Sequence, residues 1–502
     1  MLKRNVIANF IGQGWTALMG LAFIPIYIKY LDIEAYGLIG VFAILQAWLT
    51  LLDFGMTPTI NREMARYTAG GHTTKSIRDL LHSLELLCWV VAGAIILSIY
   101  LLSNWLASDW LKAEKLPIDV VAQAVAVMGL VVALRFIEGL YRGAIVGLQK
   151  QVWLNYMLSI SATARWAGAA VVVVWVKPDV TSFFLWQGLV SVFTILMFAA
   201  AVHKWLPKSE KRSKFSLKAI KNIWIFARGM LLTTLLALIL TQIDKVLLSR
   251  LISLKDFGYY TLATTVVGVL YHVITPFTQA YYPKFTEMAT LGDTSALTHT
   301  YHQAAQLVTV FIVSVSLSLI LFGHDILQIW TNNVTVATAT APVLAVLALG
   351  TMLNGLMHIP YMLQLAHGWS NFAAKVNLIA IVFLVPMILW AVPKYGVIGA
   401  AWCWALLNFG YVTIGIHFMY KKLLPREKWN WYIQDIFNPS LAITICSLIG
   451  YFSYPNFESA IAQSAWILAT LGLSFAMGVS MSSKIPFITL VSQLLLKTKV
   501  NR

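Results

Sequence analysis

Charged side chains inside long apolar stretches are the residues of this sequence best placed to do chemistry. Six of them form the candidate set: Arg135, Glu138, Arg165, Arg228, Asp244 and Lys245. A charge inside a membrane is costly, so such residues face protein or a water-filled cavity rather than lipid. The set is basic on balance, and guanidinium groups present a planar fork of donors that suits phosphate oxygens. We therefore predict that these residues line a lumen that accepts an anionic substrate.

The individual roles within this set stay open at the level of sequence. Arg165 lies near the middle of its expected helix, which makes it the best single candidate for a lumen residue. The alternative is a structural ion pair with Glu138 or Asp244 that locks two helices together. Arg135 and Glu138 are three residues apart and share a helix face, so a local ion-pair ladder competes with substrate contact. Arg228 lies close to a helix start, where snorkelling to the headgroups is the alternative.

No catalytic or metal-binding motif accompanies these charges. The sequence contains no Walker loop, no G-x-G-x-x-G after a strand, no H-E-x-x-H and no paired cysteine motif. Its three cysteines, Cys88, Cys403 and Cys446, are scattered through apolar runs, which argues against a disulfide framework or a metal site. No residue pattern therefore predicts catalysis, and no cofactor is expected.

The composition requires a membrane. Of 502 residues, 59% are hydrophobic and only 11% are charged, and apolar runs of about 20 residues recur from end to end. We predict an all-α polytopic protein of about fourteen transmembrane helices. The expected helices are 5–28, 35–56, 80–103, 119–140, 156–176, 182–203, 224–250, 258–282, 303–323, 341–366, 377–393, 397–419, 437–455 and 460–481.

The basic residues are distributed unevenly about these helices. With the N-terminus inside, 25 of them fall in cytoplasmic segments and 7 on the opposite side. This is the positive-inside pattern, and it predicts that both termini are cytoplasmic. A formal net charge of +16 would suggest nucleic acid in a soluble protein, but these positions indicate membrane topology, and no nucleic-acid partner is predicted. The basic loop around residues 204–223 is expected to lie against anionic membrane lipids.

An internal repeat divides the chain. Leu31–Gly37 (LDIEAYG) aligns with Ile252–Gly258 (ISLKDFG) at an offset of 221 residues, and the same offset carries Gly71 onto Gly292. Six expected helices separate the copies, so they share one orientation in the membrane. The predicted organisation is an N-terminal lobe (1–203), a basic cytoplasmic linker (204–223), a C-terminal lobe (224–420), and an appended helix pair with a cytoplasmic tail (421–502).

Four stretches carry a resemblance to a known family. They are NVIANFIGQGWTALMGLAFIPIYIKYLDIEAYGLIG at the start, YRGAIVGLQKQVWLN from Tyr141, TQIDKVLLSRLISLKDFGYYTLA from Thr241 and KYGVIGAAWCWALLN from Lys394. They resemble the polysaccharide transporter branch of the multidrug/oligosaccharidyl-lipid/polysaccharide (MOP) flippase superfamily, and Wzx-type O-antigen flippases in particular. The resemblance implies a MATE-like bundle of two six-helix lobes with an additional C-terminal pair.

The resemblance also implies a function. Such proteins move polyprenyl-diphosphate-linked oligosaccharides, such as O-antigen or exopolysaccharide repeat units, across the bacterial cytoplasmic (inner) membrane by alternating access. A coupling ion and the polymerase and chain-length proteins of the pathway are candidate partners. Two alternatives remain: a membrane-embedded polymerase or glycosyltransferase of the same pathway, and a drug exporter of the same superfamily. The first would need a larger extramembrane segment, and the basic balance of the charged set disfavours the second.

Overall fold

A computed structural model describes residues 2–53, 55–207, 215, 235–236, 238–455 and 457–483. Within these ranges the regular structure is helical, apart from one isolated bridge between Lys112 and Ser253. Ten of the described helical segments are long and apolar enough to cross a membrane. The predicted all-α polytopic class is therefore confirmed.

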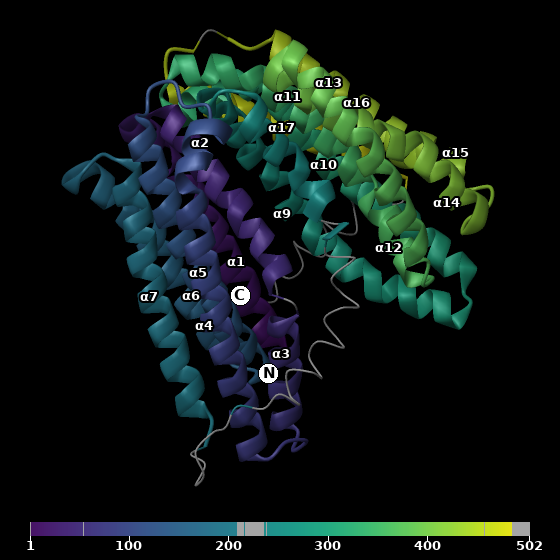
Figure 1. Ribbon diagram of the computed structural model, residues 1–502. Helices are drawn as coiled ribbons and strands as arrows, with labels where there is room; N and C mark the ends of the chain where they lie inside the picture. The colour runs from purple at the N-terminus through teal and green to yellow at the C-terminus, as the bar shows by residue number, and fades with distance from the viewer. Residues whose placement is uncertain are drawn as a thin grey trace, which may run out of the picture. The chain divides into compact units, whose positions relative to one another are not determined.

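The chain divides into two compact units, Met1–Gly258 and Tyr259–Arg502. The helices of the first unit, purple to blue in Figure 1, run alongside one another. They are α1 (Leu2–Ala22), α2 (Ile24–Leu52), α3 (Met56–Thr68), α4 (Thr74–Trp105), η1 (Leu106–Trp110), α5 (Ile118–Gly147), α6 (Gln151–Val171), η2 (Val172–Val176) and α7 (Val180–Trp205). Residues 238–251 add a further helical stretch.

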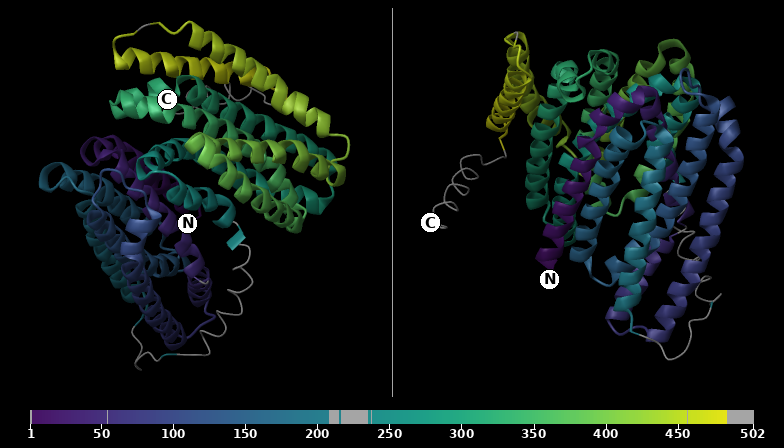
Figure 2. Two further views of the ribbon diagram at one scale, coloured as in Figure 1. Left: turned by 45° about the horizontal axis from the view of Figure 1, so that its top comes forward. Right: turned by 90° about the vertical axis from the view of Figure 1, so that its left-hand side faces the viewer.

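The second unit, teal to yellow in Figures 1 and 2, is also built of long helices. They are α9 (Leu254–Leu291), which begins in the first unit, α10 (Thr294–Thr331), α11 (Val334–Leu356), α12 (His358–Ala366), α13 (Ser370–Gly410), η3 (Tyr411–Gly415), α14 (Ile416–Lys422), α15 (Lys428–Asn430), η4 (Trp431–Phe437), α16 (Asn438–Phe452) and α17 (Ala460–Ser480). The unit boundary falls at Gly258, whereas most of the expected linker lies outside the described residues. The four-part domain division remains a prediction.

Side-chain caps account for several helix starts. The Asp179 carboxylate accepts a hydrogen bond from the Ser182 backbone N–H at 2.6 Å, and the Asp293 carboxylate accepts one from the Ala296 N–H at 2.9 Å. Each satisfies a backbone donor that the first turn of a helix leaves unpaired. Left-handed glycines turn the chain before α4 and α10, at Gly70 (φ 82°) and Gly292 (φ 71°). The two repeats therefore reverse direction by the same device.

Two expected breaks, over 29–34 and before residue 397, coincide with kinks at Asp32 (φ 71°) and Gly396 (φ 60°), which join the two parts of α2 and of α13. Conversely, the expected helix 341–366 is divided at Met357, and α3 forms within a segment expected to be a cytoplasmic connection. Hydropathy marks the apolar length of a segment, but one left-handed residue bends a helix without changing that length.

Helix α5 is the most buried of the candidate spans in the first unit. It packs against α2, α3, α4, α6 and α7. A Cβ atom at Gly143 would meet the Thr57 carbonyl oxygen at 2.8 Å, and one at Gly147 would meet the Asn61 carbonyl oxygen at 2.3 Å. These glycines, which have small-xxx-small spacing, therefore allow α3 to approach α5 closely.

In the second unit, α10 occupies a comparable central position. It packs against α11, α12, η4, α16 and α17. Its counterpart by the 221-residue offset is α4, which is far less buried: 22% of an apolar 18-residue stretch in the α4 segment is buried, against 67% of such a stretch in α10. The difference arises because α16 and α17 cover a face of α10. The C-terminal pair thus creates a buried polar environment on α10.

The two repeat segments contact each other reciprocally. A Cβ atom at Gly37 would lie 2.3 Å from the Leu254 carbonyl oxygen, and one at Gly258 would lie 2.2 Å from the Ile33 carbonyl oxygen. Positions 33 and 254, like 37 and 258, are equivalent under the 221-residue offset. The contact is therefore symmetric, as expected of two related segments that meet across a pseudo-two-fold axis.

Substitution at either glycine should disrupt this contact. We expect Gly37→Ala and Gly258→Ala each to lower membrane abundance and melting temperature, because the added methyl would lie far inside contact distance of a backbone oxygen. Gly93→Ala is the matched control, since a Cβ atom there meets nothing within 4 Å. Thermal unfolding of the purified variants measures the effect. Equal melting temperatures for all three variants would show that the reciprocal contact is not tight.

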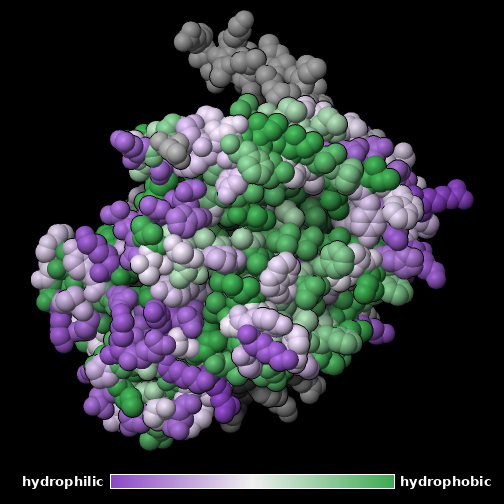
Figure 3. All heavy atoms as spheres, turned by 90° about the horizontal axis from the view of Figure 1, so that it is seen from above, coloured by the Kyte–Doolittle hydropathy of each residue, from purple (hydrophilic) through white to green (hydrophobic). Residues whose placement is uncertain are grey.

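Large apolar side chains remain exposed on the outside of the helices. Trp175, Phe452 and Ile461 are 76%, 80% and 83% exposed, respectively. Hydrophobic residues also spread over broad areas of the face in Figure 3. Soluble monomers rarely expose apolar surface on this scale, so these residues indicate contact with lipid.

Candidate substrate-binding site

Arg165 and Glu138 form a buried ion pair between α6 and α5. The Arg165 guanidinium donates to the Glu138 carboxylate at 2.5 Å, and their side chains are only 11% and 13% exposed. Both residues belong to the predicted set. The geometry matches the pairing alternative for Arg165, with Glu138 rather than Asp244 as its partner. Glu138 therefore reaches across to α6 instead of continuing a ladder along its own helix.

Arg135 lies one turn before Glu138 on α5 and is held differently. One of its terminal nitrogens donates to the Gln187 side-chain oxygen on α7 at 2.9 Å, and its guanidinium lies 5.0 Å from the centre of the Phe42 ring. Gln187 in turn donates to the Arg165 backbone oxygen at 3.2 Å. The Arg135 Nε atom is buried and has no hydrogen-bond partner among the described residues. A buried donor without an acceptor calls for an explanation such as a group absent from the structure.

Together these residues form what we call the α5–α7 cluster: Arg135, Glu138, Arg165 and Gln187. It contains two guanidinium groups and one carboxylate. Because Glu138 is engaged by Arg165, the cluster has one positive charge in excess in a largely buried setting. Such a cluster can attract an anion and donate several hydrogen bonds to it. Gln187 was missed in the sequence, where an uncharged amide within an apolar helix gives little signal.

The remaining predicted residues lie elsewhere. Lys245 donates to the Thr241 backbone oxygen at 3.0 Å within its own helical stretch, and its nitrogen is 4.0 Å from the Asp244 carboxylate. These neighbours thus approach each other, although their positions around the helix gave no reason to expect it. Arg228 lies outside the described residues. The structure therefore brings together Arg135, Glu138 and Arg165, whereas Lys245 contacts Thr241 and Asp244 of its own helical stretch.

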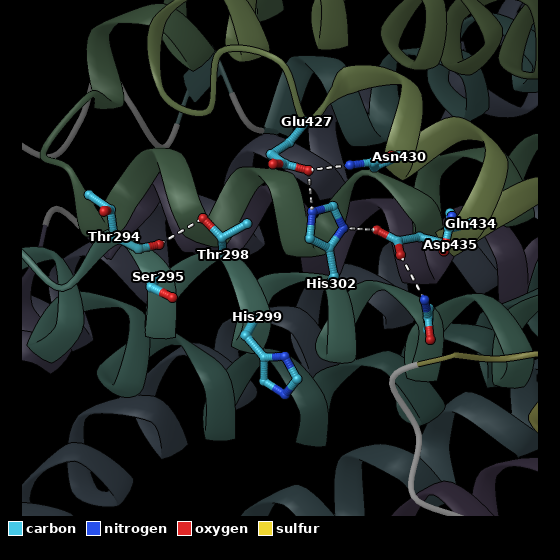
Figure 4. A pocket seen from close by; sticks show the side chains of 10 residues that line it. Thr294, Ser295, Thr298, His299, His302, Glu427, Asn430, Gln434 and Asp435 are labelled. Atoms are coloured by element: carbon cyan, nitrogen blue, oxygen red, sulfur yellow. Dashed lines mark hydrogen bonds and ion pairs between the residues drawn. The ribbon is translucent and has the colours of Figure 1, made fainter.

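A second polar site, missed in the sequence, lies in the second unit. His302 on α10 contacts the Asp435 carboxylate on η4 at 2.5 Å and the Glu427 carboxylate before α15 at 3.2 Å (Figure 4). Gln306 donates to the other Asp435 oxygen at 2.9 Å. These residues lie at the ends of apolar runs, where charge is normally solvated. Only the packing of the C-terminal helices on α10 buries them.

The fold of this chain matches that of two solved membrane proteins. Over 97% of this chain and 99% of the other, the fold matches the structure of the lipid II flippase MurJ in an inward closed conformation, with 13% identity and a TM-score of 0.72. It also matches an inward-facing multidrug resistance MATE family transporter of the MOP superfamily over 84% of this chain and 94% of that one, with 13% identity and a TM-score of 0.64. The fold is that of the MOP superfamily.

The sequence comparison defines the family. Residues 2–289, more than half of the chain, match the family model described as polysaccharide biosynthesis protein. A putative O-antigen transporter of Shigella flexneri is 20% identical over 403 residues, which cover 80% of this chain and 94% of that protein. The chain belongs to the polysaccharide biosynthesis protein family, and its long apolar helices are those of a multi-pass membrane protein. The resemblance to Wzx-type members of the MOP superfamily is confirmed.

Proposed function

We propose that this protein is a flippase for lipid-linked oligosaccharides, and that it carries polyprenyl-diphosphate-linked repeat units of a surface polysaccharide from the inner to the outer leaflet by alternating access. The observation that carries the proposal is the excess positive charge of the α5–α7 cluster. That cluster contains two guanidinium groups but only one carboxylate, which pairs with Arg165, and the Arg135 Nε lacks an acceptor among the described residues. A diphosphate supplies both the missing charge and the missing acceptor.

The family model and the relative from Shigella flexneri also support a role in polysaccharide transport. The family model is named for polysaccharide biosynthesis, and the Shigella relative is named as a putative O-antigen transporter. A lipid without an anionic group would need no cationic cluster, whereas a cationic cluster would repel an organic cation. An anionic lipid-linked glycan therefore fits the cluster better than a cationic drug.

The location of the protein follows from the same proposal. We place it in the bacterial cytoplasmic membrane with both termini in the cytoplasm, because 25 basic residues fall on that side of the expected topology and 7 on the other. A reporter fused after Arg502 should be active in the cytoplasm, and activity in the periplasm would contradict the orientation. The polymerase and chain-length proteins of the pathway would then act on the product at the outer leaflet.

A deletion strain tests the function in cells. Without the flippase, lipid-linked repeat units should accumulate unpolymerised at the inner leaflet, since synthesis continues while translocation stops. Labelling of intact and permeabilised cells with a membrane-impermeant glycan reagent measures the leaflet. Plasmid-borne wild type should restore labelling of intact cells. Repeat units that remain accessible in intact deletion cells would place the translocation step in another protein.

A further inference from the structure

The second polar site lines a pocket in the second unit. The pocket has a volume of about 630 Å³, within the range of small-molecule sites. Six of its lining residues come from α10 and four from the segment 427–435, and all ten are polar: Thr294, Ser295, Thr298, His299, His302, Gln306, Glu427, Asn430, Gln434 and Asp435. Figure 4 shows His302 between the two carboxylates, with Ser295 and His299 on the same stretch of α10.

This lining excludes several ligand classes. An apolar group, such as a polyprenyl tail, would remove polar atoms from water without pairing them. A phosphate would lie against Glu427 and Asp435, and no lysine or arginine is among the ten lining residues. Within the described part of the chain, no group of three or more histidine, cysteine or acidic side chains could hold a metal ion. A neutral polar ligand meets none of these three objections.

The hydrogen-bonding groups of the pocket are held in fixed orientations. His302 bridges Asp435 and Glu427, Gln306 donates to Asp435 at 2.9 Å, and Asn430 donates to Glu427 at 2.7 Å. A carboxylate oxygen can accept more than one hydrogen bond, so the two acids keep acceptor capacity after these contacts. The hydroxyls of Thr294 and Ser295 and the Gln434 amide add donors and acceptors around them.

We propose that this pocket binds a sugar residue of the transported glycan. Vicinal hydroxyls donate and accept at closely spaced positions, and the lining offers oriented carboxylates, amides and hydroxyls at similar positions. The inference rests on the proposed function, because a glycan substrate is what brings a sugar to this protein. It assigns recognition of the carbohydrate to the second unit.

Direct binding of free sugars tests the pocket independently of transport. The purified full chain in nanodiscs is examined by saturation-transfer NMR with glucose, galactose, N-acetylglucosamine and rhamnose at millimolar concentration. We expect transfer to at least one of them. Ser295→Trp should fill the pocket and weaken that binding about tenfold or more, as expected when a bulky side chain occupies a ligand site. Thr290→Trp is the matched control, because Thr290 is exposed near the end of α9 and does not line the pocket.

A second variant covers a failure of Ser295→Trp to fold. Gln434→Leu removes one amide from the lining and should also reduce transfer while leaving the melting temperature close to that of wild type. Absence of transfer from every sugar, or equal transfer in wild type and Ser295→Trp, would overturn the assignment. Stronger binding of spermidine or pyrophosphate than of sugars would overturn it as well. Sugar binding without flipping would contradict the proposed function alone, and flipping without sugar binding would contradict this inference alone.

Discussion

Arg165→Ala should sharply lower the amount of protein in the membrane, and adding Glu138→Gln should restore much of it. The two side chains are 2.5 Å apart and nearly buried, so removal of the arginine leaves a carboxylate without its counter-charge. Breaking a buried ion pair in this way costs about 3–5 kcal/mol, whereas replacement of both charges is often close to neutral. Immunoblots of membranes and thermal unfolding of purified variants measure the two effects.

Arg142→Ala is the control, because it removes a basic residue at an exposed position on α5, the helix of Glu138, and should leave abundance unchanged. If Arg165→Ala instead stays abundant and glycan export is lost, Arg165 is a substrate residue in a solvated path and not a structural partner of Glu138. That result would support the lumen role that the position of Arg165 near the middle of its helix predicts.

Arg135→Gln should give the opposite pattern: near-normal abundance with loss of glycan export. Arg135 carries the charge that Glu138 does not neutralise, so its removal relieves a buried positive charge rather than creating a negative one. A charge-assisted hydrogen bond contributes about 1.5–3 kcal/mol, so the loss of one or more phosphate contacts should reduce export about tenfold or more. Surface polysaccharide in a deletion strain that carries the variant is the readout.

The conservative variant separates charge from geometry. Arg135→Lys keeps the positive charge but loses the planar fork, so it should retain partial export. Arg142→Gln, on the same helix, should export normally. Full export by Arg135→Gln at equal abundance would show that the excess charge of the α5–α7 cluster does not serve the substrate, and the case for a diphosphate ligand would lose its main support.

The sequence was sufficient to predict the helical class because apolar runs must be long enough to cross a bilayer whatever their partners are. It also contains the small-xxx-small spacing of Gly143 and Gly147, a local pattern that is typical of close helix approach. It was insufficient for the division of the expected helix 341–366 at Met357, because a single residue that ends a helix leaves the hydropathy unchanged. The hydropathy of a segment of about twenty residues does not reveal a helix boundary that depends on one dihedral angle.

The sequence predicted those site residues that carry a charge within an apolar run. Arg135, Glu138 and Arg165 were found because charge within an apolar run is conspicuous, and they do lie together. Which arginine would take the single carboxylate could not be predicted, because that depends on how α5 and α6 are rotated against each other. Gln187 and the residues around His302 were missed for a related reason: an amide carries no charge, and the burial of His302 depends on the distant C-terminal helices.

Transport by the purified protein tests the central claim most directly. The full chain is reconstituted into liposomes with a fluorescent polyprenyl-diphosphate-linked oligosaccharide, and its outer-leaflet fraction is followed with a membrane-impermeant reagent, for wild type, Arg135→Gln and protein-free vesicles. We expect wild type to equilibrate the lipid between leaflets, while Arg135→Gln stays close to the protein-free rate. Equal rates in wild-type and protein-free vesicles, whatever ion gradient is imposed, would contradict the assignment of this protein as a lipid-linked oligosaccharide flippase.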